Sequence, residues 1–226
     1  MWNAKLAGKG AGILKGLFFL CLISFVFVFY GNTEDVVLYD FETDQGGWDF
    51  PDWAFSEADY VCKSITLSDK LFSSGKKSLA LEVDFTGNGF CSAIVETQAK
   101  MDLEKYNSLS CDIIMRGKAK KGVKARFIIF TGEEMTWTEM NETVSIGKDK
   151  WKTLTADITE GSLWKRLKYF ERTGADGKKI MGGYRYIKVP LTKDMKKDIR
   201  ALAIRIESES IRYKGTVYLD NIHVAE

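Results

Sequence analysis

The sequence predicts an all-β fold, an antiparallel β-sandwich of jelly-roll type with about ten strands and one short helix in a long insertion. Short segments in which apolar and polar residues alternate support this prediction. The segments are rich in Val, Ile, Phe, Tyr and Thr, and Gly, Asp, Asn and Lys separate them. The alternation is clearest in residues 201–207, where every second residue is Leu or Ile.

Ten segments have the character of strands. They are residues 36–42, 60–67, 78–85, 91–98, 109–116, 123–131, 135–141, 151–157, 201–207 and 216–224. Their short spacing and the lack of helical segments between most of them favour antiparallel pairing in two sheets.

The insertion, residues 158–200, departs from this pattern. The apolar residues at 163, 164, 167 and 170 have helical spacing, so we expect a short amphipathic helix there. Residues 174–177, Gly-Ala-Asp-Gly, are expected to form a turn, and residues 184–189 an additional strand that ends at Pro190. Long insertions on a β-scaffold often carry function, and a surface excursion without function is the alternative.

The N-terminus has the pattern of an export signal. Three lysines, Lys5, Lys9 and Lys15, precede an apolar run over residues 17–30, and no acidic residue occurs before Glu34. A basic start followed by an apolar run shorter than the roughly 20 residues of a membrane span is typical of a secretory signal. We therefore expect an exported protein whose β-sandwich domain occupies residues 32–226.

The end of this segment leaves its fate open. A cut after Gly31 would place the bulky Phe29 three positions before it, where a small residue is expected. Residues 1–31 are therefore either a cleaved signal peptide or a retained membrane anchor. The domain is accordingly expected to be periplasmic, extracellular or tethered to the membrane, and to meet the membrane only through this segment.

Charge and histidine content exclude several classes of function. The chain has 33 basic and 31 acidic residues, and three of the basic ones belong to residues 1–31, so the domain is close to neutral. A dedicated nucleic-acid-binding domain would carry a basic stripe, so no nucleic-acid partner is expected. His223 is the single histidine, which argues against a Ser-His-Asp triad and against a multi-histidine metal site.

The domain contains three cysteines, Cys62, Cys91 and Cys111. An odd number in an oxidising compartment allows one disulfide and one remaining thiol. Cys111 alternates with Leu109 and Ile113, so we expect it to be a small buried residue on a strand. Cys62 and Cys91 are then the candidate disulfide pair, although spacing does not fix the connectivity.

Several segments, in their order along the chain, resemble the jelly-roll carbohydrate-binding modules of the galactose-binding-domain-like superfamily. They are Leu38-Tyr39-Asp40-Phe41-Glu42 with Gly46-Gly47-Trp48, residues 73–81 (SSGKKSLAL), Asp102-Leu103 leading to residues 106–110 (YNSLS), residues 151–157 (WKTLTAD) and residues 215–222 (GTVYLDNI). The resemblance covers essentially residues 36–226. It implies the sandwich fold and a polysaccharide or oligosaccharide partner, but the fold alone does not determine the ligand.

The resemblance also implies a structural calcium ion. Modules of this superfamily commonly hold one that joins the first strand to the last. Asp40 and Glu42 leave the same face of the first strand, and Asp220 lies in the last strand. These carboxylates, with backbone carbonyls of the loop at residues 75–78, would supply oxygen ligands for calcium. The alternative is that they are ordinary exposed acids at strand ends.

A sugar-binding site needs flat aromatic faces for the C–H surface of the ring and polar groups for its hydroxyls. Trp48 and Trp151 match packing positions of the resembling modules, and Trp164 is expected to anchor its helix. The remaining candidates are Trp53, which follows Pro51 in a loop, and Trp137, which shares its strand face with Glu139. Anchoring the loop is an equal alternative for Trp53, and core packing is the alternative for Trp137.

Charged residues in the middle of strands complete the candidate site. If the apolar residues of these strands face the core, each charged residue projects from the opposite side of its own sheet, which is the concave side for Arg126. The charged residues are Arg126, Arg205, Glu207 and Asp112. Cross-strand ion pairing on a solvated sheet would give the same pattern.

These features predict an exported carbohydrate-binding module with no catalytic activity of its own. A glycosidase or lyase on the same fold is one alternative, although no catalytic constellation stands out. A structural or protein-interaction sandwich at the cell surface is the other, and it would show an exposed apolar patch. The sequence does not determine the sugar or the oligomeric state.

Overall fold

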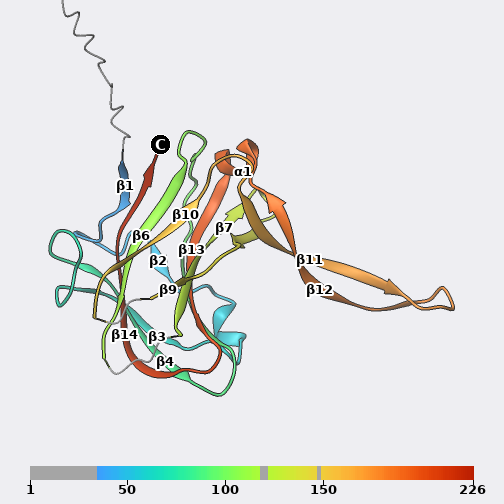
Figure 1. Cartoon of the computed structure of the whole chain (residues 1–226), viewed down its shortest axis with the longest axis horizontal. Helices are drawn as coiled ribbons and strands as arrows, with labels where there is room; N and C mark the ends of the chain where they lie inside the picture. The colour runs from blue at the N-terminus through green and yellow to red at the C-terminus, as the bar shows by residue number, and fades with distance from the viewer. Residues whose placement is uncertain (1–34, 118–121, 147–148) are drawn as a thin grey trace, which may run out of the picture. The chain divides into compact units, whose positions relative to one another are not determined.

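The computed structural model describes residues 35–117, 122–146 and 149–226, and residues 33–226 form one compact unit. Two antiparallel sheets pack face to face in it (Figure 1). The predicted export segment, residues 1–31, lies outside the described residues. Within those described ranges, no helix is long and apolar enough to cross a membrane.

One sheet has six strands. In spatial order it contains β10 (Lys152–Asp157), β6 (Ser108–Met115), β14 (Arg212–Ala225), β4 (Ser78–Thr86) and β3 (Cys62–Ser68), and β1 (Val36–Tyr39) also pairs with β14. The first and last strands of the described domain are therefore neighbours, as the resemblance implied.

The second sheet has eight strands. In spatial order it contains β12 (Lys179–Pro190), β11 (Leu163–Thr173), β8 (Thr136–Met140), β7 (Lys124–Thr131), β13 (Ile199–Ser208), β5 (Cys91–Thr97) and β2 (Trp48–Asp49), and β9 (Val144–Ser145) pairs with β7. The central strands β7 and β13 pair directly, with Arg126 opposite Arg205. This register fixes which side chains share the outer face.

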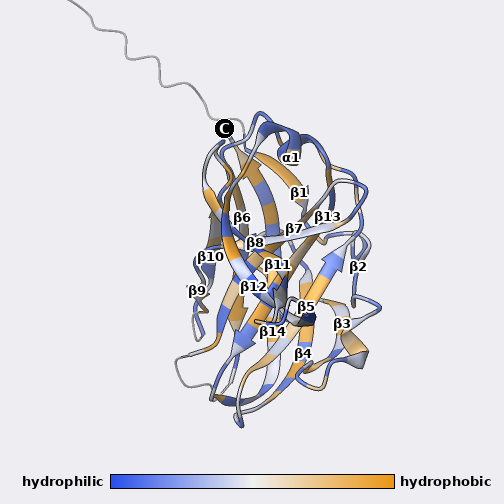
Figure 2. Ribbon diagram, turned by 90° about the vertical axis from the view of Figure 1, so that its right-hand side faces the viewer, coloured by the Kyte–Doolittle hydropathy of each residue, from blue (hydrophilic) through white to orange (hydrophobic). Residues whose placement is uncertain are grey.

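The core lies between the two sheets. Every second residue of β7 and β13 is fully buried there against apolar residues of β4, β6 and β14. These residues are Phe127 and Ile129 on β7, and Leu202, Ile204 and Ile206 on β13. Figure 2 shows the corresponding alternation of hydrophobic and hydrophilic residues along the strands. The predicted strand phases are therefore confirmed, and Trp48 and Trp164 are buried packing residues.

All ten predicted strands are present, and the antiparallel sandwich is confirmed. The helix predicted over residues 163–170 is wrong, because these residues belong to β11 and pair with β12 in a long hairpin. Their apolar spacing also suits a strand, since Trp164 points to the core and Leu163 and Leu167 lie on the other face. Within the insertion the structure instead has a short helix, α1 (Lys193–Lys197).

The predicted disulfide is not formed in the structure, where Cys62, Cys91 and Cys111 are free and buried. Cys62 lies on β3 of the six-stranded sheet and Cys91 on β5 of the eight-stranded sheet. Their sulfur atoms have different neighbours: the Cys62 Sγ donates to the Ser64 carbonyl, and the Cys91 Sγ lies 3.4 Å from the Thr86 hydroxyl. The expectation for Cys111 is confirmed, because it is fully buried on β6.

Buried thiols should resist modification in the folded protein. Burial raises the pKa of Cys62 to about 11, so little of the reactive thiolate is present near neutral pH. We expect a disulfide-exchange reagent to react slowly with these thiols in native protein and to count all four cysteines of the full chain after denaturation without reductant. A count of two after denaturation would show that a disulfide forms.

Candidate functional site

The outer face of the eight-stranded sheet carries a second apolar cluster on the side away from the core. It consists of Ile94, Ile128, Phe130, Ala201 and Ala203. Tyr60 and Trp137 are partly buried and pack against this cluster. The sheet thus has an apolar layer on both sides, and the outer layer forms a floor on which aromatic side chains rest.

Beside this floor, four charged side chains form a closed ring. Arg126 donates to Glu139 at 2.8 Å and to Glu207 at 2.6 Å. Arg205 forms an ion pair with the other oxygen of Glu139 at 2.9 Å and donates to the other oxygen of Glu207 at 2.8 Å. Each carboxylate therefore divides its two oxygens between the two arginines, and the ring, here called the charge ring, is neutral as a whole.

The charge ring is nearly inaccessible to solvent, since each of its four side chains is about one-tenth exposed or less. Burial lowers the pKa of Arg205, but the charges of Glu139 and Glu207, with a contribution from Tyr186, outweigh burial and raise it above its ordinary value. Removing ions from water is costly, so such a ring is stable only while every charge keeps its partners. The cross-strand ion pairing that the sequence offered as an alternative is thus present for these residues.

Trp137 is held in place by the ring and the floor. Its Nε1 donates to Glu139 at 3.2 Å, and its ring centroid lies 5.3 Å from that of Phe130 in an edge-to-face arrangement. The guanidinium carbon of Arg205 lies 5.9 Å from the indole centroid. These contacts fix the orientation of the indole before any ligand arrives.

Trp53 reaches the same place from a distant segment. It precedes the short 3-10 helix η1 (Ala54–Ser56), which follows Pro51. Its ring centroid lies 5.8 Å from that of Trp137 at an interplanar angle of 59°, and the residue is 40% exposed. The two tryptophans form an inclined aromatic pair whose surface is open to solvent.

A hollow of about 430 Å³ lies over this pair. Its lining comes from the loop before β3, from β5, β8, β11, β12 and β13, and includes Trp53, Asp59, Tyr60, Phe90, Trp137, Leu167, Tyr186 and Arg205. Trp53, Trp137 and Arg205 were predicted, whereas Tyr60, Leu167 and Tyr186 were missed. Tyr184 and Tyr186 alternate in the insertion, and this pattern could have identified Tyr186 from the sequence.

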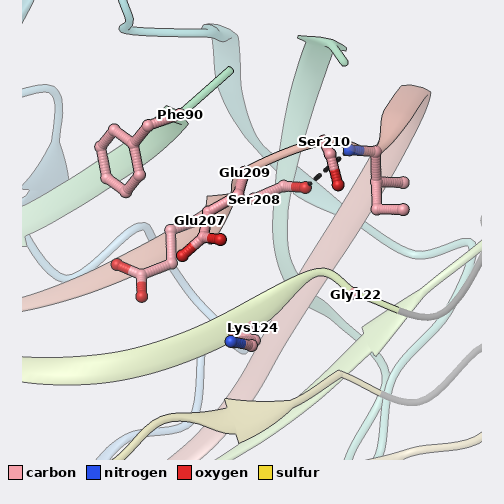
Figure 3. Close-up of a pocket in the computed structure, with 8 residues that line it drawn as sticks. Phe90, Gly122, Lys124, Glu207, Ser208, Glu209 and Ser210 are labelled. Carbon is pink, nitrogen blue, oxygen red and sulfur yellow. Dashed lines mark hydrogen bonds between the residues drawn. The ribbon is translucent and has the colours of Figure 1, made fainter. Parts of the chain in front are cut away.

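A second hollow of about 230 Å³ adjoins the first, because Phe90 lines both. Figure 3 shows Phe90, Glu207 and Lys124 around it, with the Ser208 hydroxyl accepting a hydrogen bond from the backbone of Ile211. Glu207 thus belongs at once to the charge ring and to the wall of this second hollow. The outer face is therefore recessed over a longer stretch than the tryptophan pair alone.

The arrangement suits a neutral, hydroxyl-rich ligand. The tryptophan faces can stack on C–H surfaces, while Arg205 offers donors and Asp59 an acceptor at the wall of the hollow. Both oxygens of Glu139 are engaged by the arginines and by Trp137, so this buried carboxylate orients the indole and is not itself open to a ligand.

The predicted ligand residue Asp112 does not belong to this face. It lies on β6 of the six-stranded sheet, opposite Asp220, and accepts hydrogen bonds from Ser73 at 2.9 Å and Thr153 at 2.8 Å. The phase of a strand shows which face a residue occupies but not which sheet contains the strand, so the sequence did not show that Asp112 lies apart from Arg126 and Arg205.

The predicted calcium ligands do not fit a cation site. Glu42 accepts hydrogen bonds from the backbone amides of Lys76 and Lys77 at 2.8 and 3.0 Å. Asp220 accepts three from Ser73 and Ser74, and Asp40 accepts one from the Glu42 amide. Within residues 35–117, 122–146 and 149–226, no group of three or more acidic, histidine or cysteine side chains could hold a metal ion.

Hydrogen bonds from backbone amides to carboxylates therefore join the loop at residues 73–77 to Glu42 and to Asp220 of the last strand, which calcium was expected to join. The loop at residues 73–77 directs N–H groups toward the acids, where the prediction required carbonyl oxygens. Burial raises the pKa of Asp220, and the hydrogen bonds from Ser74 and Ser73 act in the opposite direction. A carboxylate surrounded by donors is already satisfied and has little capacity left for a cation.

The fold is that of the β-sandwich carbohydrate-binding modules of the galactose-binding-domain-like type. The chain belongs to the family described as mannanase, galactose-binding domain-like, whose family model matches residues 39–163. A comparison with curated proteins found no significant match.

Two solved structures illustrate the fold. One is a carbohydrate-binding module, CBM28, specific for non-crystalline cellulose, with a TM-score of 0.52 and 14% identity over 84% of this chain and 95% of that chain. Another is CBM27-1 of Caldicellulosiruptor saccharolyticus in complex with mannohexaose, with a TM-score of 0.48 and 20% identity over 84% of this chain and 96% of that chain. The likeness to CBM28, at such low identity, establishes the fold only.

Removing one carboxylate from the charge ring should destabilise the domain strongly. In Glu139→Ala two buried arginines each lose a partner, and we expect the free energy of unfolding to fall by about 3–5 kcal/mol. Urea unfolding followed by circular dichroism measures this. The matched control is Glu171→Ala, which removes a surface ion pair with Lys179 and should change stability by less than about 1 kcal/mol. Equal effects of the two substitutions would contradict the role of the ring.

Calcium should leave the stability of the domain unchanged. A site with a Kd of about 10⁻⁴ M would add about 2.7 kcal/mol at 100 times Kd, which raises Tm by roughly 5–10 °C for a domain of this size. Because the carboxylates face amide donors, we expect the same Tm in excess calcium and in excess EDTA. A calcium-dependent rise that EDTA reverses would show that the loop rearranges to bind the ion.

Proposed function

We propose that this chain is an exported, non-catalytic carbohydrate-binding module that holds a polysaccharide on the outer face of its eight-stranded sheet. The observation that carries the proposal is the meeting of Trp53 and Trp137 over a recess whose wall includes Arg205. Membership of a family described as a mannanase domain makes mannan the first polymer to test. Non-crystalline cellulose, the ligand of the CBM28 module, is the second.

In this proposal the polymer lies across the recess with sugar rings against the two indoles. Arg205 and Tyr186 donate to hydroxyl oxygens, and Asp59 accepts from hydroxyl groups. The charge ring and the apolar floor already fix the Trp137 side chain, so little rotamer freedom is lost on binding. Such preorganisation increases affinity because fewer groups must be ordered in the complex.

The proposed export rests on the N-terminal segment, with its three lysines before an apolar run. A polysaccharide-binding module must reach the compartment in which the polymer occurs, so export and binding agree. Either a released or a tethered domain satisfies this requirement.

An enzyme on the same face is the alternative. Burial raises the pKa of Glu96, a carboxyl on the outer side of β5, which is a property of catalytic acids. A glycosidase would need a second carboxylate roughly 5–9.5 Å away that is available for catalysis. Release of reducing sugar from mannan or cellulose by the full chain, abolished in Glu96→Gln, would establish that alternative.

Substitution of Trp137 should weaken polysaccharide binding. Trp137→Ala removes the indole face and its contacts with Glu139, and we expect at least a tenfold loss of affinity, about 1.4 kcal/mol. Affinity electrophoresis of the full chain in gels containing soluble galactomannan or a soluble cellulose derivative measures this loss. Trp53→Ala changes an exposed loop residue and should act in the same direction without affecting the core.

The matched control is Trp151→Ala. Trp151 is also partly buried, but it packs against Ala80, Ile114 and Tyr218 on the outer side of the six-stranded sheet. Its removal should leave binding unchanged. The proposal would be refuted if the unsubstituted chain bound neither polymer, or if Trp151→Ala weakened binding as much as Trp137→Ala.

A further inference from the structure

The hairpin formed by β11 and β12 extends beyond the sandwich (Figure 1). Only Trp164, Lys165 and Arg166 of β11 pair with β8, so from Leu167 onward β12 is the only strand paired with β11. The family match ends at residue 163, where the hairpin begins. An isolated two-stranded ribbon is only marginally stable in water, so its exposed side chains call for a functional explanation.

The two faces of the hairpin differ in character. The register places Leu167 opposite Tyr186 and Tyr169 opposite Tyr184 on one face, here called the tyrosine face. Tyr184 is 70% exposed and Tyr169 is 48% exposed, and their ring centroids lie 5.2 Å apart. The tyrosine face is thus an exposed apolar and aromatic strip on a projecting element, and such strips mark interaction sites.

The opposite face is cationic. Lys168 lies opposite Arg185 there, and the Arg185 guanidinium carbon lies 3.6 Å from the centroid of the Phe170 ring. Lys168 and Arg185 therefore lie away from the tyrosine face, which meets Lys165 and Lys188 only at its end next to the sheet. The exposed side chains of the tyrosine face beyond that end are uncharged, and they suit the C–H surfaces of a sugar ring.

The tyrosine face continues the binding face of the sheet. Lys165 pairs with Glu139 of the charge ring, and Leu167 and Tyr169 follow it at intervals of two residues on the same side. Leu167 and Tyr186 line the hollow together with Trp137. The Tyr169–Tyr184 pair lies about 7 Å further out along the strands, a distance comparable to the length of one sugar residue.

The position of Tyr169 is also constrained. A Cβ atom at Gly182 would lie 2.6 Å from the Tyr169 ring, so the ring lies directly over this glycine. Glycine at this position lets the tyrosine lie against the backbone of the partner strand. The pair therefore offers a partly ordered aromatic surface, as the tryptophans of the hollow do.

We propose that the tyrosine face is a distal subsite for the polysaccharide bound in the hollow, so that one neutral glycan chain passes from Trp137 along the hairpin to Tyr169 and Tyr184. This proposal rests on the proposed function. It adds that the hairpin makes the module selective for long chains, because a short oligosaccharide fills the hollow without reaching the tyrosine pair.

Calorimetric titration of the full chain with manno-oligosaccharides of increasing length and with galactomannan tests the proposal. Tyr169→Ala/Tyr184→Ala should weaken binding of galactomannan about tenfold and leave the affinity for the shortest oligosaccharide that binds unchanged. Phe170→Ala is the matched control, because this aromatic residue adjoins Tyr169 but lies on the cationic face. It should change neither affinity.

The outcomes separate this proposal from the proposed function. If Trp137→Ala abolishes binding but the tyrosine double variant binds galactomannan normally, the distal subsite is refuted and the binding face stands. If the double variant weakens short and long ligands equally, or if Phe170→Ala weakens galactomannan binding as much, the subsite is also refuted. A change from dimer to monomer in the double variant, with normal glycan binding, would assign the tyrosine face to a second copy of the chain.

Discussion

The candidate site depends on one buried interaction, the closed ring of Arg126, Glu139, Arg205 and Glu207. Three central strands of the eight-stranded sheet contribute its members, and each carboxylate connects both arginines. Because an unpaired buried charge is costly, the ring fixes the relative positions of these strands and of the side chains that pack on their outer face. Trp137 takes its orientation from Glu139, and the hollow takes its shape from Trp137.

The ring also explains why this face suits binding better than chemistry. Glu139 and Glu207 are the acids closest to the tryptophan pair in the hydrogen-bond network, and the arginines occupy all four of their oxygens. Such buried and fully paired carboxylates hold the strands and Trp137 in position but are poorly placed to donate a proton. The aromatic surface above them supplies contact area that depends little on the exact sugar, which suits a module that binds polymers.

Strand alternation in the sequence predicted much of this arrangement. A period of two residues was sufficient to place Arg126 and Arg205 on the outer side of their strands and to identify Trp137 with Glu139 as neighbours. The same reasoning could not assign Asp112 to one of the two sheets, because the pairing order that assigns β6 to the other sheet depends on contacts between distant segments. Strand phase is a local property, whereas sheet membership is not.

The other differences between the sequence-based expectations and the structure have similar causes. The spacing of apolar residues in 163–170 suits a helix and a strand equally, and the pairing with β12 decided between them. The calcium prediction relied on acids at the right strand ends, but the direction of the amides in the loop at residues 73–77 is visible only in the structure. Tyr60, Leu167 and Tyr186 were missed because the hollow joins them from three separate segments.

The most direct test of the account is a crystal structure of the protein with mannohexaose. The account predicts sugar rings against Trp53 and Trp137, with hydroxyl groups bonded to Arg205, on the outer face of the eight-stranded sheet. Mannohexaose bound instead beside Trp151 on the six-stranded sheet, or at the loop of residues 73–77 near Asp112, would contradict it.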